Sequence, residues 1–356
     1  MPKSNICIKV PKKRGERAIA LANKLGLIDK SLEIRRDEGN IFIPVIRQPD
    51  ENELKTLNNE VHETQLSTSV FAEKRSTAQS LLQVLENSLP PNLLASLPQA
   101  LDIIGNIVVI EIPPELKGSE KLIGEAILKT HKNVRTVLDK AGAVGGTYRL
   151  REFTFIAGEH NTQTIHREFG CQYHVDLAKA YFSPRLSQEH QRVASLVKTG
   201  ETVVDLFAGV GPFSVLIAKK NPGVRVYAVD INPEAFELLK VNARVNRVEN
   251  RVFPILGDAR QITINKLKDS ADRVIMNLPE TAIEFVDTAC QAIKPHGGKI
   301  HFYAFVRSPD SIENLQLRFS QAVKSTGRRV ETFLYARSIR ETAPYESQVV
   351  LDAVVA

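Results

Sequence analysis

The stretch Val203-Val204-Asp205-Leu206-Phe207-Ala208-Gly209-Val210-Gly211-Pro212-Phe213 decides the fold of this 356-residue chain. Its apolar start predicts a buried strand. Gly209 and Gly211 predict a turn in which side chains are removed where a ligand approaches the backbone. Pro212 fits the first turn of a following helix. This strand–turn–helix order is typical of open α/β sheets, which bind ligands at the carboxyl ends of their strands.

Strands and helices alternate on the C-terminal side of this stretch. We expect strands over 202–206, 225–230, 252–256, 273–277 and 299–304, and helices over 214–219, 234–246 and 283–293. Such a rhythm predicts a parallel sheet covered on both faces. The sequence therefore predicts an α/β, Rossmann-like domain over residues 166–356.

The glycine turn favours S-adenosylmethionine over a dinucleotide as the ligand. Ser214 stands where G-x-G-x-x-G would have its third glycine, so a pyrophosphate could approach this turn less closely. Asp205 lies immediately before the turn, where a carboxylate can act on the amino-acid end of the cofactor through water or backbone. A nicotinamide dehydrogenase is the alternative that this pattern disfavours.

Acidic residues follow the next two strands. Asp230 is placed to accept hydrogen bonds from ribose hydroxyls, and Asp258, in the turn after the third strand, can meet the adenine amino group. Each acid alone could be an ordinary turn or cap residue, but acids at three successive strand ends are a more specific combination. The predicted cofactor-binding set is Asp205, Phe207, Gly209, Gly211, Asp230, Asp258 and Asn277.

The segment Asn277-Leu278-Pro279 follows the fourth strand and matches the [N/D]-[P/L]-P motif of methyltransferases that modify a nitrogen of planar bases. The amide of Asn277 offers both an acceptor and donors to a purine edge. Pro279 stiffens the loop and offers an apolar face. An ordinary turn containing Asn and Pro is the alternative.

The N-terminal half reads as two smaller α+β domains. Residues 1–50 combine a helix over 17–27 with a strand over 40–45. The polar residues 51–68 are predicted to be a linker that is helical in part. Residues 69–165 form the middle domain, with helices over 78–89 and 121–131 and strands over 107–112 and 133–138. Its cluster of Lys129, His131, Lys132 and Arg135 is either a solvated face or a phosphate contact surface.

The composition is that of a folded protein with a basic balance. Lys and Arg number 47 against 41 Asp and Glu, a net charge of +6 that suits a polyanionic partner without proving one. Three distant cysteines suggest neither a disulfide framework nor a zinc site. We see no signal peptide and no apolar run of about 20 residues that could span a bilayer, so a cytoplasmic location is expected.

Further motifs make the chain resemble the archaeal and eukaryotic tRNA (guanine-N1)-methyltransferase family that acts at position 37. They are Thr164-Ile165-His166-Arg167-Glu168-Phe169-Gly170-Cys171, Val175-Asp176, Tyr181-Phe182-Ser183-Pro184-Arg185-Leu186 with Glu189, Asp102 to Ile107, and His131 to Leu138. The resemblance covers essentially the whole chain. It implies a class I S-adenosylmethionine-dependent methyltransferase domain and a monomer that binds tRNA. The N-terminal domain would touch the outer corner of the tRNA, and the middle domain would hold the anticodon stem-loop.

The resemblance also implies catalytic roles. Glu189 corresponds to the general base that removes the N1 proton, and Arg149 corresponds to a cation beside guanine O6. Tyr181, Asn277 and Pro279 would position the flipped base and the methyl donor. Arg151, expected on the same strand face as Arg149, is the alternative cation.

One departure concerns His190, where the family often has Arg; the guanidinium contact is lost there unless Arg192 substitutes. Two further functions stay open. One is transfer of the aminocarboxypropyl group of the same cofactor in wyosine synthesis. The other is a non-catalytic tRNA-binding protein, which would bind no cofactor. Methylation of a wyosine intermediate also stays open, as a second activity beside methylation of guanosine.

Overall fold

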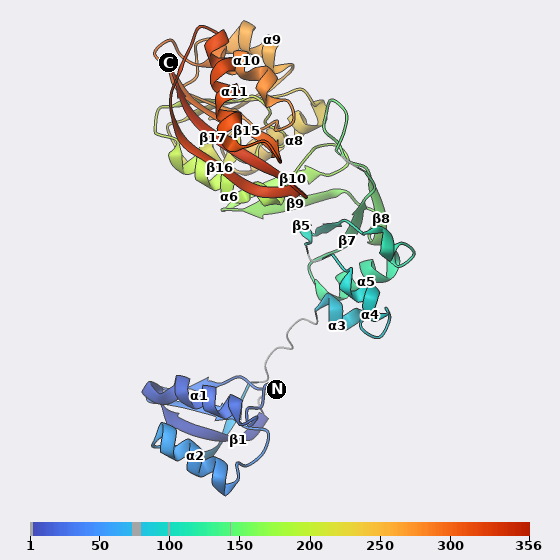
Figure 1. Cartoon of the computed structure of the whole chain (residues 1–356), viewed down its shortest axis with the longest axis vertical. Coiled ribbons are helices and arrows are strands. Elements are labelled where there is room, and N and C mark those ends of the chain that lie inside the picture. Colours follow the sequence, from blue (N-terminus) through green and yellow to red (C-terminus); the bar gives the residue numbers. More distant parts are fainter. Residues whose placement is uncertain (1–2, 73–79, 99, 143) are drawn as a thin grey trace. The chain divides into compact units, whose positions relative to one another are not determined.

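The computed structural model describes residues 3–72, 80–98, 100–142 and 144–356, and the chain divides into two compact units, residues 1–83 and 84–356 (Figure 1). None of the helices in the described part of the chain combines the length and the apolar character needed to cross a bilayer. All three cysteines are buried and unpaired.

The first unit is a four-stranded antiparallel sheet, in the order β2-β3-β1-β4, with two helices. Its elements are β1 (Lys3–Pro11), α1 (Gly15–Lys24), β2 (Arg35–Arg36), β3 (Asn40–Pro44), α2 (Glu51–Val61) and β4 (Gln65–Phe71). Because side chains alternate along a strand, Ile8 and Ile43 pack with Leu21 of α1 and Leu57 of α2. Both helices therefore cover the same face of the sheet.

Residues 51–68 are part of the folded unit and not a linker, although the helix expected in part of them is present as α2. Asp50 and Glu53 form a capping box that starts α2, in which each side chain accepts a hydrogen bond from the other's backbone N–H. Strand β4 then pairs with β1 along its whole length. The capping-box spacing was readable in the sequence. The apolar periodicity of this helix is weak because Leu57 and Val61 are its only buried residues.

The second unit begins with a mixed sheet in the order β5-β6-β7-β8. Helix α3 (Leu81–Leu85) spans the division at residue 83. The elements that follow are α4 (Pro91–Ala95), β5 (Asp102–Ile104), β6 (Ile107–Ile110), α5 (Glu120–Thr130), β7 (Thr136–Lys140) and β8 (Phe153–Gly158). Helix α5 connects the parallel pair β6 and β7, the usual route between parallel strands. The expected helix over 78–89 corresponds to α3; its predicted start at Ala78 lies outside the described residues.

A hairpin of β9 (Gln163–Glu168) and β10 (Cys171–Asp176) follows. The expected domain boundary at residue 165 falls inside β9. Apolar side chains of the middle sheet, such as Ile107 and Leu138, share one buried cluster with Tyr173 of β10 and Val203 of the next sheet. This shared core explains why residues 84–356 form a single compact unit.

The predicted α/β, Rossmann-like sheet is confirmed. It has seven strands in the order β13-β12-β11-β14-β15-β17-β16. The elements are α6 (Ser187–Leu196), β11 (Thr202–Asp205), α7 (Pro212–Lys220), β12 (Arg225–Asp230), α8 (Pro233–Val245), β13 (Val252–Leu256), α9 (Ala259–Ile262), β14 (Arg273–Met276), α10 (Val286–Ala292), β15 (Gly298–Arg307), α11 (Ile312–Ser325), β16 (Val330–Ala343) and β17 (Glu346–Val355). The first five strands are parallel, whereas β17 and β16 add an antiparallel edge that the sequence rhythm did not predict.

Candidate active site

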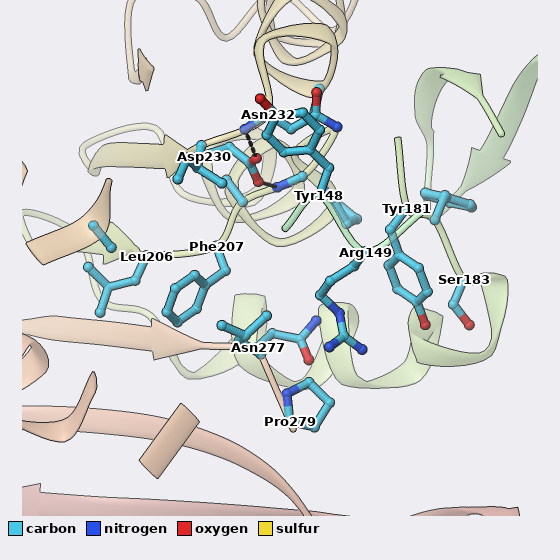
Figure 2. A pocket seen from close by; sticks show the side chains of 18 of the residues that line it. Tyr148, Arg149, Tyr181, Ser183, Leu206, Phe207, Asp230, Asn232, Asn277 and Pro279 are labelled. Carbon is cyan, nitrogen blue, oxygen red and sulfur yellow. Dashed lines mark hydrogen bonds between the residues drawn. The ribbon is translucent and has the colours of Figure 1, made fainter. Parts of the chain in front are cut away.

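A pocket of about 260 Å³ lies at the carboxyl ends of β11, β12 and β14 (Figure 2). The strand order reverses at β11, so the loops after β11 and β14 diverge and leave a crevice between them. We call this crevice the strand-end pocket. Its wall includes eight of the predicted site residues: Arg149, Tyr181, Phe207, Gly209, Asp230, Asp258, Asn277 and Pro279. Asp205, Gly211 and Glu189 are not on its wall.

Gly209 and Gly211, the two glycines of the turn, have different structural roles. Gly209 lines the pocket with φ +57°, and a Cβ placed there would meet only the Tyr181 carbonyl oxygen at 3.8 Å. Its N–H donates to Asp230 Oδ2 at 2.6 Å, while Oδ1 of the same carboxylate accepts from the backbone of Asn232 at 2.8 Å. Gly211 instead caps α7 with φ +90° and packs on Leu239. Gly209 thus leaves the backbone open toward the pocket, whereas Gly211 does not line it; that both glycines bind the cofactor stays a prediction.

We expect Gly211→Ala to lower the free energy of unfolding by about 2–4 kcal/mol, because it combines a left-handed φ with overpacking. The new Cβ would lie 2.3 Å from Cδ1 of Leu239, a fully buried side chain. Gly209→Ala is the matched control. Its Cβ would make only an ordinary contact with the Tyr181 carbonyl oxygen at 3.8 Å, and the substitution should cost about 1 kcal/mol. Urea denaturation measures both values, and equal losses would contradict this division of roles.

Asp205 lies beneath the turn rather than in the pocket. Its carboxylate is 1% exposed. Oδ2 accepts from the Ser214 hydroxyl at 2.8 Å, and Oδ1 has no hydrogen-bond partner within the described part of the chain. Burial raises the pKa of Asp205 to about 7, against the hydrogen bonds from Ser214 and the backbone of Phe207. Burial likewise raises the pKa of Asp230. In this geometry, the carboxylate of Asp205 does not contact a ligand in the pocket directly.

The raised pKa of Asp205 predicts a pH-dependent stability. Between the ordinary pKa of 3.8 and the folded value of about 7, the folded chain holds a proton that the unfolded chain has lost. The contribution of Asp205 is thus complete below pH 4 and is lost as the pH rises through 7, a change of about 4 kcal/mol. Urea denaturation from pH 4 to 8 should show a stability that falls more steeply with pH in the parent than in Asp205→Asn, because the raised pKa of Asp230 is common to both proteins. Parallel curves for the two proteins would contradict the assignment.

Asp258 and Phe207 form one side of the strand-end pocket. Asp258 is the N-cap of α9, where its Oδ1 accepts from the backbone N–H groups of Arg260 and Gln261. It is thus both a cap residue and a wall residue. The ring of Phe207 stands edge-on to Phe285, with 5.0 Å between centroids. This pair gives the pocket an apolar, aromatic side that suits the face of a flat ring system.

Arg149, Tyr181, Asn277 and Pro279 surround the other side (Figure 2). Asn277 accepts a long hydrogen bond, 3.5 Å, from the amide of Gln348 on β17, so most of its hydrogen-bonding capacity is free. The carbonyl of Pro279 accepts from the backbone of Phe305 at 3.2 Å, which ties the loop to β15. The motif therefore presents an amide and a proline ring from a fixed loop.

Arg149 is placed by a turn and not by a strand, contrary to expectation. Its backbone has φ +56°, and its N–H donates to the carbonyl of Gly146. The guanidinium is 2.6 Å from Glu280 and lies over the Tyr181 ring at 5.8 Å. Arg151 donates to the carbonyl of Gly142 and is absent from the wall of the strand-end pocket. Of the two candidate arginines, the geometry thus favours Arg149 over Arg151 as a cation facing this pocket.

Glu189 lies in a buried charge network behind the pocket. Its carboxylate accepts from Arg192, at 2.8–3.1 Å, and from the Tyr303 hydroxyl at 3.0 Å. Arg192 also donates to Asp352. Burial alone would raise the pKa of Asp352, but hydrogen bonds from His301 and Arg192 lower it to about 2. Arg192 is therefore engaged in this network and does not replace a guanidinium in the pocket wall.

His190 is a wall residue whose contacts the sequence did not reveal. Its ring is 1% exposed and lines the pocket, and its Nδ1 donates to Glu168 Oε1 at 2.7 Å. Because a carboxylate only accepts, this contact fixes the proton on Nδ1. Gln348 and Arg340, from β17 and β16, also line the pocket. No local motif marks Gln348 and Arg340, since both reach the pocket on the antiparallel pair β16 and β17.

Comparisons with known proteins agree over the whole chain. The TRM5/TYW2 methyltransferase domain matches residues 164–331, the TYW2 N-terminal domain matches 81–162, and the tRNA methyltransferase 5 N-terminal domain matches 7–53. The chain is 42% identical, over 98% of both sequences, to the tRNA (guanine(37)-N(1))-methyltransferase Trm5b of Pyrococcus abyssi.

Solved structures place the same fold beside two ligands. The structure of aTrm5 in complex with tRNALeu is similar with a TM-score of 0.73 and 33% identity, covering 99% of this chain and 100% of that one. The Methanocaldococcus jannaschii TYW2 in complex with AdoMet is similar with a TM-score of 0.56 and 29% identity, covering 72% of this chain and 99% of that one.

Proposed function

Because the chain belongs to the tRNA (guanine(37)-N(1))-methyltransferase family, we propose that it transfers the methyl group of S-adenosylmethionine to N1 of guanosine 37 in tRNA. One observation carries the proposal. The glycine turn, the acid after β12 and the Asn277–Pro279 corner open on a single pocket that Arg149 also faces. The donor and the base edge can therefore meet in one place.

The residues of the strand-end pocket fit an adenosyl group. Gly209 leaves its backbone open to a ligand, and each Asp230 oxygen keeps a lone pair for a ribose hydroxyl beside its backbone hydrogen bond. Asp258 faces the adenine amino group, and Phe207 with Phe285 covers the ring. When bound, S-adenosylmethionine supplies an electrophilic methyl group on a sulfonium. The chain's own part is to hold that group in line with the base nitrogen.

The base is held on the opposite side of the pocket. Asn277 and Pro279 grip the purine edge, and Tyr181 limits its position. Loss of the N1 proton pushes negative charge onto guanine O6. The guanidinium of Arg149, already fixed over Tyr181, stabilises that charge. Glu280, its partner in the free enzyme, keeps the guanidinium at the pocket wall.

Glu189 is the proposed proton acceptor. In the free enzyme its carboxylate is held by Arg192 and Tyr303, one residue away from the pocket-lining His190. Catalytic hydrogen bonds often form only in the substrate complex. A change of side-chain rotamer when guanosine binds would exchange the contact with Arg192 for the base, while Arg192 stays neutralised by Asp352.

The remaining parts of the chain serve the rest of the tRNA. The middle sheet holds the anticodon stem-loop, and the N-terminal unit contacts the outer corner through exposed cations such as Lys12, Lys13 and Arg14. We take the acting unit to be a monomer. These roles follow the family's use of tRNA and the net positive charge of the chain.

Methyl transfer to tRNA transcripts carrying G, A or inosine at position 37 tests the proposal. G and inosine share the N1 proton and O6 and should be methylated, whereas A lacks both and should not. The mass of the product nucleoside separates methyl from aminocarboxypropyl transfer, and calorimetry with S-adenosylhomocysteine tests the non-catalytic alternative. Methylation of A, or no transfer to any transcript, would overturn the proposal.

A further inference from the structure

A second pocket, of about 290 Å³, adjoins the strand-end pocket and shares Arg149, Tyr181 and Arg340 with it. We call it the arginine pocket. Five cations line it, namely Lys140, Arg149, Arg151, Arg185 and Arg340, against three acids, namely Asp102, Glu280 and Glu346. The walls come from β7, the turn before β8, the segment before α6, and the β16–β17 pair. Of this lining, the mechanism above uses Arg149, its partner Glu280, and Tyr181.

The three acids are already paired. Asp102 binds Arg185 at 2.5 Å, Glu280 binds Arg149 at 2.6 Å, and Glu346 binds Arg307, outside the pocket, at 2.7 Å. Lys140, for its part, contacts Glu111 at 3.2 Å, also from outside the pocket lining. These pairs neutralise three of the five cations and leave Arg151 and Arg340.

Arg151 and Arg340 are held in place but not neutralised. Arg151 donates to the carbonyl of Gly142 at 2.8 Å. Arg340 donates to the Gln348 amide oxygen at 2.8 Å and to the Ser183 hydroxyl at 3.3 Å. Neither guanidinium has a carboxylate within 4.0 Å among the residues that the structure describes. Neutral partners orient each guanidinium and leave its full charge for a ligand.

Two oriented, uncompensated guanidinium groups in a partly enclosed pocket fit a phosphate, since the planar fork of arginine matches phosphate oxygens. We propose that Arg151 and Arg340 bind the RNA phosphodiester groups that flank the target nucleotide, so that the arginine pocket holds the backbone while the base enters the strand-end pocket. This inference rests on the proposed function. In this proposal, Arg151 contacts the phosphodiester backbone of the RNA and is not the cation beside guanine O6.

Equilibrium binding of full-length tRNA by the parent chain, Arg151→Gln and Arg340→Gln, from 50 to 300 mM KCl, tests the proposal. Each variant should bind roughly tenfold more weakly at the lowest salt, and its slope of log Kd against log[KCl] should fall by about 0.7, the share of one single-stranded phosphate contact. Arg318→Gln is the matched control, because Arg318 is 53% exposed, pairs with Asp310 and lies outside both pockets. Losses no larger than those of the control would overturn the inference.

Neutral methylphosphonate linkages on either side of nucleotide 37 give the reciprocal test. On such tRNA, parent and variants should bind alike, because the charge that the arginines contact is gone. A loss that persists in full would show that the arginines act elsewhere. Weaker binding of S-adenosylhomocysteine by Arg340→Gln would assign that residue to the cofactor and overturn its half of the proposal. Since binding is measured, a parent chain that bound tRNA without methylating it would refute the proposed function and leave this inference testable.

Discussion

Arg149→Ala is expected to lower kcat for tRNA methylation by roughly 10²–10³-fold, the usual loss when one preorganised donor to a developing oxyanion is removed. The guanidinium is only 19% exposed, is fixed by Glu280 and Tyr181, and faces the pocket that also holds Asn277. It therefore needs no reorganisation when charge reaches O6. Single-turnover rates at saturating tRNA, with S-adenosylhomocysteine affinity measured beside them, provide the comparison.

Two variants separate this role from other effects of charge. Arg149→Lys keeps the positive charge but loses the planar set of N–H donors of the guanidinium. Its rate should therefore lie between those of the parent and Arg149→Ala. Arg151→Ala removes a guanidinium two residues away that lines only the arginine pocket. It should weaken tRNA binding and leave the saturated rate close to that of the parent. If Arg151→Ala lost as much saturated rate as Arg149→Ala, the O6 assignment would be wrong.

Glu189→Gln is the second substitution with a large expected effect, a loss of roughly 10²–10⁴ in kcat, the range attributed to general base catalysis. The amide can still accept from the Tyr303 hydroxyl, and Arg192 keeps its contact with Asp352, so the fold around α6 should survive. Cofactor binding should also persist, because Glu189 is not on the wall of the strand-end pocket. Rate against pH, measured in a single turnover, is the most direct readout.

Glu201→Gln is the matched control for the loss of a buried ion pair. Glu201 accepts from Arg273 at 2.9 and 3.2 Å, and Arg273 donates in turn to His301, which donates to Asp352. The change alters the same network at its far end. It should lower thermal stability with little change in saturated rate. Equal rate losses in Glu201→Gln and Glu189→Gln would mean that Glu189 supports the fold and does not accept the proton.

Local patterns in the sequence determined the catalytic sheet and the cofactor side of the site. Strands β12 and β13 begin and end where their apolar runs predict, and Gly209, Asp230 and Asp258 lie at or shortly after the ends of successive strands. In a parallel sheet the carboxyl ends of neighbouring strands meet at one edge. Residues at these strand ends lie together at one edge of the sheet, independent of how the other segments pack. They could therefore be predicted from the sequence.

The tertiary structure alone decided which side chains of β16 and β17 join the pocket and whether each charged group near it is neutralised. Glu189 meets Tyr303 and Arg192 meets Asp352 across 114 and 160 residues of sequence. Arg340 reaches the pocket on an antiparallel edge strand that follows no simple rhythm. Whether a charge is neutralised depends on atoms a few ångströms away, and sequence spacing carries no information about neighbours that only the packing of distant segments brings together.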